Sequence, residues 1–491
     1  MTSPCRICRR SCATWLQPKL RKHLKQFRDC FASHKSRGHL ETYVEGQLSN
    51  LLRKSVEPIA LAVDIPPRTL QQFLNSLAWD QEQMVDTLQA VVARDHTSPR
   101  SIGLIDETSC SKQGDKTPGV QRQWCGSTGK TDNCVVTVHL GYAVDAFHCL
   151  LGSELYLPQS WAQDRPRCRR AHIPDEIDYR PKWQIALELL DRARTNGVTF
   201  RYLVFDEGYG SKPEFLRQLQ AREQLYVAEV PRSFTGWLKA PHVAARSFHR
   251  HGRGRGRATP RLAAGSPAAQ SAEYHLNWTP ALKDQTWKKW RIKDTHKGPL
   301  VWETKHVMLM PKDEQGLPDK PLHLVVAQSV MDPSEVKYFL SNAPAGTPLS
   351  ELLLVAFSRW HIERCFEDQK TELGFDHFEG RSYLGLKRHQ VVTAVSHLFL
   401  AEVQQELRGE KSGADGLPGS DRGRCPGSFV VARPYRSRNA DRSRGEADRI
   451  LPATQRHRPS QPHQDNTGKT PRAGRHINRV APLPLECGLA L

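Results

Sequence analysis

The chain has 491 residues, and its 71 Lys and Arg residues against 52 Asp and Glu residues give a formal net charge of +19. This length allows two or three domains, and the positive excess favours a polyanionic partner, first of all nucleic acid. The sequence has neither an apolar run of eighteen residues nor, at its N-terminus, the apolar stretch of a secretory signal. We therefore expect a cytoplasmic protein with no membrane contact, whose twelve cysteines stay mostly reduced.

The N-terminal cysteines have a spacing that raises the question of zinc. Cys5, Cys8 and Cys12 follow the pattern C-x2-C-x3-C, and Cys30 or His34 would supply a fourth ligand. The second close pair that is typical of a structural zinc site is missing from the sequence. Free thiols are therefore the favoured interpretation, and zinc is the alternative.

Residues 1–95 are predicted to be helical. Apolar residues recur at helical spacing over 40–63, and a second such segment over 65–95 begins with a Pro-Pro pair, where proline suits a helix start. Helices around a short break suit a DNA-binding module, and they equally suit any helical bundle. We assign residues 1–95 as an N-terminal helical, DNA-binding domain.

Residues 96–235 change to strands that alternate with helices, which predicts the first part of an α/β core. The stretch GSTGK at 126–130 lacks the full phosphate-loop form, so we expect a strand-to-strand loop there and no ATP binding. The runs read as strands are 101–108, 133–144, 147–158, 201–210 and 225–231, and those read as helices are 182–197 and 211–224.

Residues 236–345 are predicted to form a β-rich insertion, with strands over 300–310 and 322–330. Near its start lies the basic loop HRHGRGRGR at 249–257, which is either simply solvated or contacts DNA phosphates. Helical character returns over 346–408, which we assign to the core as its later, helical part.

The remaining residues, 409–491, form an irregular basic tail. Residues 411–491 carry 15 Lys and Arg against 7 Asp and Glu, are rich in Pro, Gly and Ser, and lack an apolar period, which favours disorder. A shifted reading frame is the alternative, because 462–476 can be back-translated so that the next frame encodes a basic, helix-like segment. The nucleotide sequence of the gene distinguishes the two.

Two carboxylates follow apolar, strand-like runs. Asp106 ends SIGLID and Asp206 ends YLVFD, so both are expected at the carboxyl rim of the sheet, where sites form in α/β folds. Glu363 lies on the helix-like stretch 359–374, beside its apolar stripe. Three converging acids need divalent cations to neutralise them, and hard oxygen ligands favour two Mg²⁺ or Mn²⁺ ions, which can support phosphoryl transfer.

The same stretch places Arg359, Glu363 and Lys370 within about 40° of one another at 100° per residue. An amphipathic helix with surface ion pairs explains such a line without any site. The carboxylates at the ends of two predicted core strands favour instead a functional site to which this helix contributes. Two other acids compete for the roles, Glu107 beside the first aspartate and Glu367 one turn after Glu363, and we prefer Asp106 and Glu363.

The stretches LIDET, VFDEGYG and RWHIERCFEDQK resemble the DDE transposases of bacterial insertion sequences, in the subgroup with a Tyr-x2-Arg-x3-Glu-x6-Lys signature. The stretches GVQRQWCGSTGKTDNC, KDEQGLP, NAP and YLGLKRH are similar to those of the insertion sequence 701 family, and the resemblance covers roughly residues 25–408. It implies an RNase H-like core with a β-rich insertion between the second Asp and the Glu. In one departure, the signature tyrosine falls on Ala356, next to Phe357.

The resemblance implies that Asp106, in an Asp-x-Thr context, is the first catalytic and metal-binding acid, followed by Asp206 and Glu363. It implies that Arg359 and Lys370 hold backbone phosphates of DNA near the cut. It further implies a bacterial, nucleoid-associated enzyme that uses Mg²⁺ or Mn²⁺ and acts as a homodimer on double-stranded DNA, namely terminal inverted repeats and target DNA.

Two rival functions remain at this point. One is a catalytically inactive, DNA-binding remnant of a transposable element, which the irregular tail favours and the three intact acids disfavour. The other is an RNase H-type nuclease acting on hybrids, against which the long insertion and the N-terminal helices argue.

Overall fold

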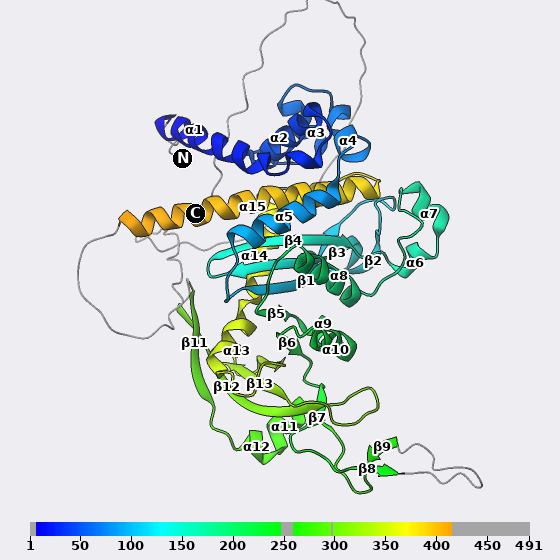
Figure 1. The fold of residues 1–491 in the computed structure, drawn as a ribbon, viewed down its shortest axis with the longest axis vertical. Coiled ribbons are helices and arrows are strands. Elements are labelled where there is room, and N and C mark those ends of the chain that lie inside the picture. The colour runs from blue at the N-terminus through cyan, green and yellow to red at the C-terminus, as the bar shows by residue number, and fades with distance from the viewer. Residues whose placement is uncertain (1–5, 247–258, 296–297, 415–491) are drawn as a thin grey trace, which may run out of the picture.

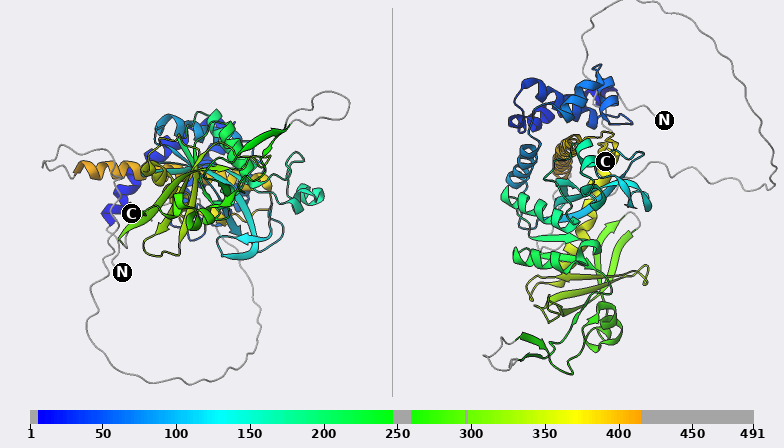
Figure 2. Two further views of the ribbon diagram at one scale, coloured as in Figure 1. Left: turned by 90° about the horizontal axis from the view of Figure 1, so that it is seen from below. Right: turned by 90° about the vertical axis from the view of Figure 1, so that its right-hand side faces the viewer.

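The computed structural model describes residues 6–246, 259–295 and 298–414, and the structural statements below concern that part of the chain. The N-terminal helices lie at one end of the molecule and the small strands β8 and β9 at the other (Figures 1 and 2). Cys5, the basic loop at 249–257 and the tail from 415 onward lie outside the described residues. None of the helices in the described part is long and apolar enough to cross a membrane.

Residues 6–95 fold into five α-helices, and each of the two helical segments predicted from periodicity, 40–63 and 65–95, is divided between two of them. Pro67 occupies the first turn of α4, as expected, and the Asp80 carboxylate caps α5 by accepting the backbone N–H groups of Glu82 and Gln83, each at 2.9 Å. The elements are α1 (Arg6–Lys25), the 3₁₀ turn η1 (Arg28–Cys30), α2 (His34–Leu48), α3 (Val56–Ala62), α4 (Pro67–Asn75) and α5 (Gln81–Asp95).

The centre of the molecule is a mixed sheet in which five strands run in the order β4–β3–β1–β5–β6. β1 is antiparallel to β3 and parallel to β5, and β5 is parallel to β6, which is consistent with an RNase H-like core. The strands of this region are β1 (Ile102–Ser111), β2 (Gln121–Cys125), β3 (Lys130–Val144), β4 (Phe147–Leu155), β5 (Tyr202–Phe205) and β6 (Tyr226–Val230).

The later strands extend the same sheet, because β14 pairs with β6 and is followed by β13 and β12. The strands expected over 300–310 and 322–330 are found as β12 and β13. This part comprises β7 (Thr235–Trp237), β8 (Val243–Arg246), β9 (Thr259–Leu262), β10 (Gln270–Ser271), α11 (Ala272–Trp278), α12 (Pro280–Lys283), β11 (Lys288–Thr295), β12 (Gly298–Pro311), β13 (Leu322–Ser329) and β14 (Val336–Ser341).

Helices cover the sheet, and the longest, α15, lies between β4 and the N-terminal helices (Figure 1). It runs to Ala414, six residues beyond the expected end at 408. The other helices are α6 (Gln159–Ala162), α7 (Arg165–Arg170), α8 (Lys182–Thr195), α9 (Glu207–Gly210), α10 (Pro213–Ala221), α13 (Leu349–Ala356), η2 (Phe357–Arg359), α14 (Trp360–Thr371) and η3 (Phe375–His377), and α15 itself is Tyr383–Ala414.

A single buried arginine fastens α15 to the N-terminal helices. Arg388 is 4% exposed, and its guanidinium lies 4.4 Å from the ring of Trp79. It donates to four backbone carbonyls at the end of α4 and in the α4–α5 connection, those of Phe73, Leu74, Leu77 and Trp79. The carbonyl of Phe73 also accepts from Trp79 Nε1 at 2.7 Å. Because a guanidinium offers five donors in a fixed plane, one side chain can serve all four carbonyls at once.

The expectation that the first strand ends at Asp106 is wrong. β1 continues to Ser111, which pairs with Cys134 of β3, so Asp106 lies in mid-strand. The polar residues after it do not end the strand, because Thr108 and Ser109 find hydrogen-bond partners on other elements. Turn-forming residue types therefore did not mark a turn here.

Candidate active site

Asp106 lies in the middle of the core sheet, on a strand flanked by β3 and β5. Its carboxylate is almost completely buried and accepts the backbone N–H of Glu107 at 2.7 Å. Burial, and then the negative charge of Asp206, raise the pKa of Asp106 to about 7, although Arg359 acts in the opposite direction. The first two predicted acids are therefore close enough to repel each other.

Asp206 directly follows β5, as predicted, and caps the short helix α9 by accepting the backbone N–H of Tyr209 at 3.3 Å. Two glycines make this tight turn possible. A Cβ on Gly208 would lie 3.1 Å from a carboxylate oxygen of Asp206, and one on Gly210 would lie 1.9 Å from the carbonyl oxygen of Glu229. The glycines of the motif DEGYG thus let the backbone pack against both the carboxylate and β6.

Arg359 connects the first and third predicted acids. It stands where η2 passes into α14, and its Nη1 lies 3.1 Å from Asp106 Oδ2. Its Nη2 lies 2.9 Å from Glu363 Oε1, one helical turn further on. The structure thus brings Asp106 together with Arg359, which lies 253 residues later in the sequence, and with Glu363, four residues after Arg359.

Lys370 fixes the other end of α14 to β1. Its ammonium group donates to Thr108 Oγ1 at 2.7 Å and to the carbonyl of Ser109 at 3.2 Å. Both cations predicted to hold DNA phosphates, Arg359 and Lys370, are therefore engaged with groups of the site itself in the DNA-free chain. Their contact with phosphates stays a prediction.

The two competing acids have partners elsewhere. Glu107 pairs with Lys182 at the start of α8, and successive residues of a strand point to opposite faces, so its side chain leaves the face of Asp106. Glu367 pairs with Arg364 at 3.0 Å on the surface of α14. Of these three glutamates, Glu363 is the one whose ion pair involves the same arginine, Arg359, as that of Asp106.

Tyr209 is a residue of the site that sequence reasoning missed. Its side chain is buried, and its hydroxyl lies close to the Glu107 carboxylate. Burial, followed by the carboxylates of Glu107, Asp106 and Asp206, raises the pKa of Tyr209 well above its usual range. The motif DEGYG marked this position, but nothing in the sequence indicated that the ring turns inward.

The residues present fit a divalent cation by their donor chemistry. Asp106 and Asp206 offer hard carboxylate oxygens, and the repulsion between them is what a bound Mg²⁺ or Mn²⁺ would relieve. Across residues 6–246, 259–295 and 298–414, no three His, Cys, Asp or Glu side chains form a complete metal cluster. Glu363 is linked to Asp106 through Arg359. Cys30, one of the ligands considered for zinc, is a buried free thiol.

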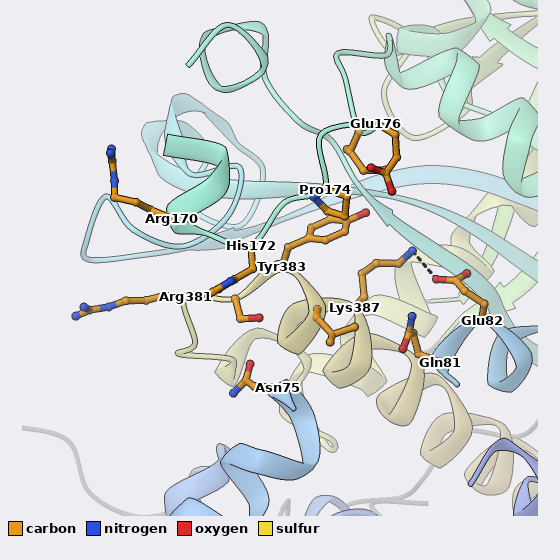
Figure 3. Close-up of a pocket in the computed structure, with 13 residues that line it drawn as sticks. Asn75, Gln81, Glu82, Arg170, His172, Pro174, Glu176, Arg381, Tyr383 and Lys387 are labelled. Atoms are coloured by element: carbon orange, nitrogen blue, oxygen red, sulfur yellow. Dashed lines mark hydrogen bonds and ion pairs between the residues drawn. The ribbon is translucent and has the colours of Figure 1, made fainter. Parts of the chain in front are cut away.

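A cavity of about 750 Å³ lies away from these acids, between the N-terminal helices, the segment after α7 and the start of α15 (Figure 3). Lys387 points into it but already pairs with Glu82 at 2.8 Å and with Glu154 at 3.4 Å. Because Lys387 is already paired with two carboxylates and the three acids are absent from the lining of the cavity, we do not assign the chemistry to it. Its walls are formed by Asn75, Gln81, Glu82, Arg170, His172, Pro174, Glu176, Ile177, Arg381, Ser382, Tyr383, Leu384 and Lys387.

The sequence pattern of the DDE superfamily endonucleases matches residues 26–299, more than half of the chain. The chain belongs to this family. Asp106 and Asp206 of this DDE superfamily endonuclease lie within the matched residues, and Glu363 lies beyond them.

The chain is also similar to a transposase of an insertion sequence. The probable transposase for insertion sequence element IS701 from Microchaete diplosiphon is 30% identical over 205 residues, which is 40% of this chain and 51% of that protein. The chain thus spans about half the length of this relative. The resemblance predicted from the motifs is confirmed.

Replacing Asp106 by Asn is expected to raise the melting temperature of the metal-free protein above about pH 7. The folded state binds the proton of Asp106 more tightly than the unfolded state does, because the pKa of this carboxyl is raised in the folded protein. The free energy of unfolding therefore falls as the pH rises from about 4 to about 7. Asn cannot ionise, and the gain should be on the order of 2–4 kcal/mol above pH 7 and absent below about pH 4.

The measurement is thermal unfolding in EDTA across that pH range. Asp175→Asn is the matched control, because Asp175 is an exposed aspartate 3.8 Å from Arg169. This variant should show the same dependence of melting temperature on pH as the wild type. Identical profiles for the wild type and Asp106→Asn would contradict the assignment of a desolvated, repelled carboxylate.

Proposed function

We propose that this chain is a transposase that cuts and joins DNA at insertion-sequence ends by metal-dependent phosphoryl transfer. The observation that carries this proposal is Asp106 on β1 beside Asp206 at the end of the neighbouring strand β5, with Arg359 paired to both Asp106 and Glu363. Membership of the DDE superfamily and the similarity to a probable insertion-sequence transposase support it.

Asp106, Asp206 and Glu363 would hold one or two Mg²⁺ or Mn²⁺ ions. Such ions supply an activated water or 3′-hydroxyl and stabilise the leaving oxygen. The chain contributes the rest: β1 and β5 position the two aspartates on one sheet, and α14 brings Glu363 beside them. Arg359 lies next to the acids and can take a backbone phosphate once a cation has replaced it as their counter-charge.

The partner in this proposal is double-stranded DNA, bound as terminal inverted repeats and as target. The formal charge of +19 supports a polyanionic partner. We further propose that the helices of residues 6–95 form a DNA-binding domain, that a homodimer acts on paired ends, and that the protein works at the bacterial nucleoid. An inactive DNA-binding remnant is the second candidate, favoured by the composition of residues 409–491.

The experiment offers the purified protein three labelled substrates in Mg²⁺: its element's terminal inverted repeats, unrelated duplex DNA and an RNA–DNA hybrid. We expect strand cleavage at the repeat ends, and none in EDTA. Specific binding of the repeats without cleavage would favour the remnant, and preferential hybrid cleavage would overturn both.

Lys370→Ala is expected to weaken DNA binding without changing which sequence is chosen, because phosphate contacts position DNA but carry little sequence information. Loss of one phosphate contact should flatten the plot of log affinity against log salt by roughly one unit. The check is a salt titration on repeat and non-repeat DNA for the wild type and the variant. An altered base preference at an unchanged slope would show that Lys370 does not contact phosphate.

A further inference from the structure

A buried histidine lies beside the first acid, on the face of the sheet that carries the candidate site. His139 of β3 lies opposite Asp106 of β1 and opposite Ser153 of β4, so the three side chains share one face. Residues directly opposite each other in antiparallel strands have Cβ atoms about 4.5–5.5 Å apart. His139 is fully buried, at 0% exposure. It is therefore an immediate neighbour of Asp106 that the proposed chemistry does not use.

Two hydroxyl groups hold the ring of His139. Its Nε2 lies 2.7 Å from Thr137 Oγ1, and its Nδ1 lies 2.7 Å from Ser153 Oγ. A neutral imidazole has one donor and one acceptor nitrogen, and a hydroxyl group can play either part, so both hydrogen bonds form at once. With both nitrogens bonded, the plane of the ring is fixed. Because apolar groups of the same shape can replace a buried hydrogen-bonded pair at little cost, stability alone does not explain a histidine here.

The ring of His139 supports the helix that carries the third acid. α14 packs across β1, β3 and β4 (Figure 1). The ring centroid of His139 lies 4.9 Å from that of Phe366 in α14 and 5.6 Å from that of Phe375 in η3, with ring planes at 68° and 63°. Aromatic rings favour such edge-to-face contacts. The imidazole therefore meets both α14 and the segment that follows it.

Phe366 lies on the side of α14 that also carries Glu363 and Lys370. At 100° per residue, it is about 60° from Glu363 and about 40° from Lys370 around the helix. Lys370 is itself bonded to Thr108 of β1. α14 is thus held on the sheet at two points of one side, by the lysine and by the ring of His139, and Glu363 belongs to that side.

We propose that His139 is a positioning residue for the proposed metal site. Its ring sets the spacing between α14 and β1, and with it the distance between Glu363 and Asp106. His139 itself touches neither the metal nor the DNA. Residues that orient metal ligands in this way change metal affinity or activity by about 10- to 100-fold when they are replaced. The inference rests on the proposed function, because it takes Glu363 as a metal ligand.

The test combines cleavage of labelled inverted repeats, at saturating Mg²⁺ and DNA, with hydrogen exchange of the backbone amides in the DNA-free, full-length protein. His139→Ala is expected to cleave roughly 10- to 100-fold more slowly with unchanged DNA affinity in EDTA. The amides of α14 should exchange faster in this variant, because the helix has lost its support. His139→Gln, whose amide can donate and accept as the imidazole does, should restore most of the rate.

His275→Ala is the matched control. His275 is 5% exposed, and its ring is also bonded at both nitrogens, to Thr279 Oγ1 at 2.9 Å and to the carbonyl of Gly236 at 3.1 Å. It lies on α11, in the extension of the sheet. Its loss should lower the melting temperature as much as that of His139, yet leave cleavage and the exchange of α14 unchanged. Ser153→Ala, at a half-buried position, removes one of the two hydroxyl groups that hold His139 and should slow cleavage by a smaller factor.

Equal losses of cleavage from His139→Ala and His275→Ala would show that only stability is involved and would overturn the positioning role. Unchanged exchange of α14 in His139→Ala would overturn it as well. If His139→Ala does not fold, Ser153→Ala decides, and wild-type cleavage and exchange in that variant would overturn the inference. No cleavage by the wild type would instead reject the transposase proposal.

Discussion

Alanine at Asp106, Asp206 or Glu363 is expected to lower DNA cleavage by roughly 10³-fold or more, with DNA affinity changed only a few fold. Each substitution removes a metal ligand of the proposed site, whereas the contacts with backbone phosphates remain. The assay is cleavage of labelled inverted repeats in Mg²⁺, with affinity measured in parallel in EDTA, where no strand is cut.

Glu107→Ala and Glu367→Ala are the controls, since both acids pair with cations outside the site. We expect both to cleave at close to the wild-type rate. An active Glu363→Ala together with an inactive Glu367→Ala would move the third acid one turn along α14. Cleavage by Asp106→Ala at the wild-type rate would remove the metal site from this part of the sheet.

Arg388→Ala is expected to lower the free energy of unfolding by about 3–5 kcal/mol, among the largest effects of one substitution. The change leaves the four backbone carbonyls at Phe73, Leu74, Leu77 and Trp79 buried without their common donor. It also removes the cation from the ring of Trp79. The N-terminal helices should therefore loosen from α15 before the sheet unfolds.

Urea unfolding measures this loss, and limited proteolysis shows which part opens first. Arg408→Ala is the control in the same helix, where an exposed arginine donates to one carbonyl, that of Ala146, at 3.0 Å. Equal stability of the two variants would show that the hydrogen bonds of Arg388 do not hold the N-terminal helices in place.

Local patterns predicted much of this fold. The apolar run YLVFD gave the start of β5 and the position of Asp206 at its end, because a short apolar run is specified within a few residues, but the strand predicted over 201–210 stops at Phe205 and 207–210 form α9. GSTGK is the expected strand-to-strand turn, between β2 and β3. The end of β1 was misplaced because Thr108 and Ser109 are held by Lys370 of α14 and by Ser127 in the turn between β2 and β3, and both partners lie outside the strand itself.

The residues of the candidate site could be predicted from the sequence only where they belong to a recognised motif. Periodicity placed Glu363 and Arg359 on one helix face, but their contact with Asp106 joins residues 253 positions apart, and only the resemblance indicated it. The inward turn of Tyr209 and the burial of Arg388 depend on packing between distant elements. A polar residue in a sequence carries no sign of the tertiary contacts that bury it.

The most direct test of the metal site is iron-mediated cleavage of the polypeptide itself. Fe²⁺ replaces Mg²⁺ in the purified protein, ascorbate and peroxide generate radicals at the bound ion, and the cut positions are mapped by mass spectrometry. The account predicts cuts close to residues 106, 206 and 363, suppressed by excess Mg²⁺ and lost in Asp106→Asn. Cuts confined to other segments, or an unchanged pattern in Asp106→Asn, would contradict it.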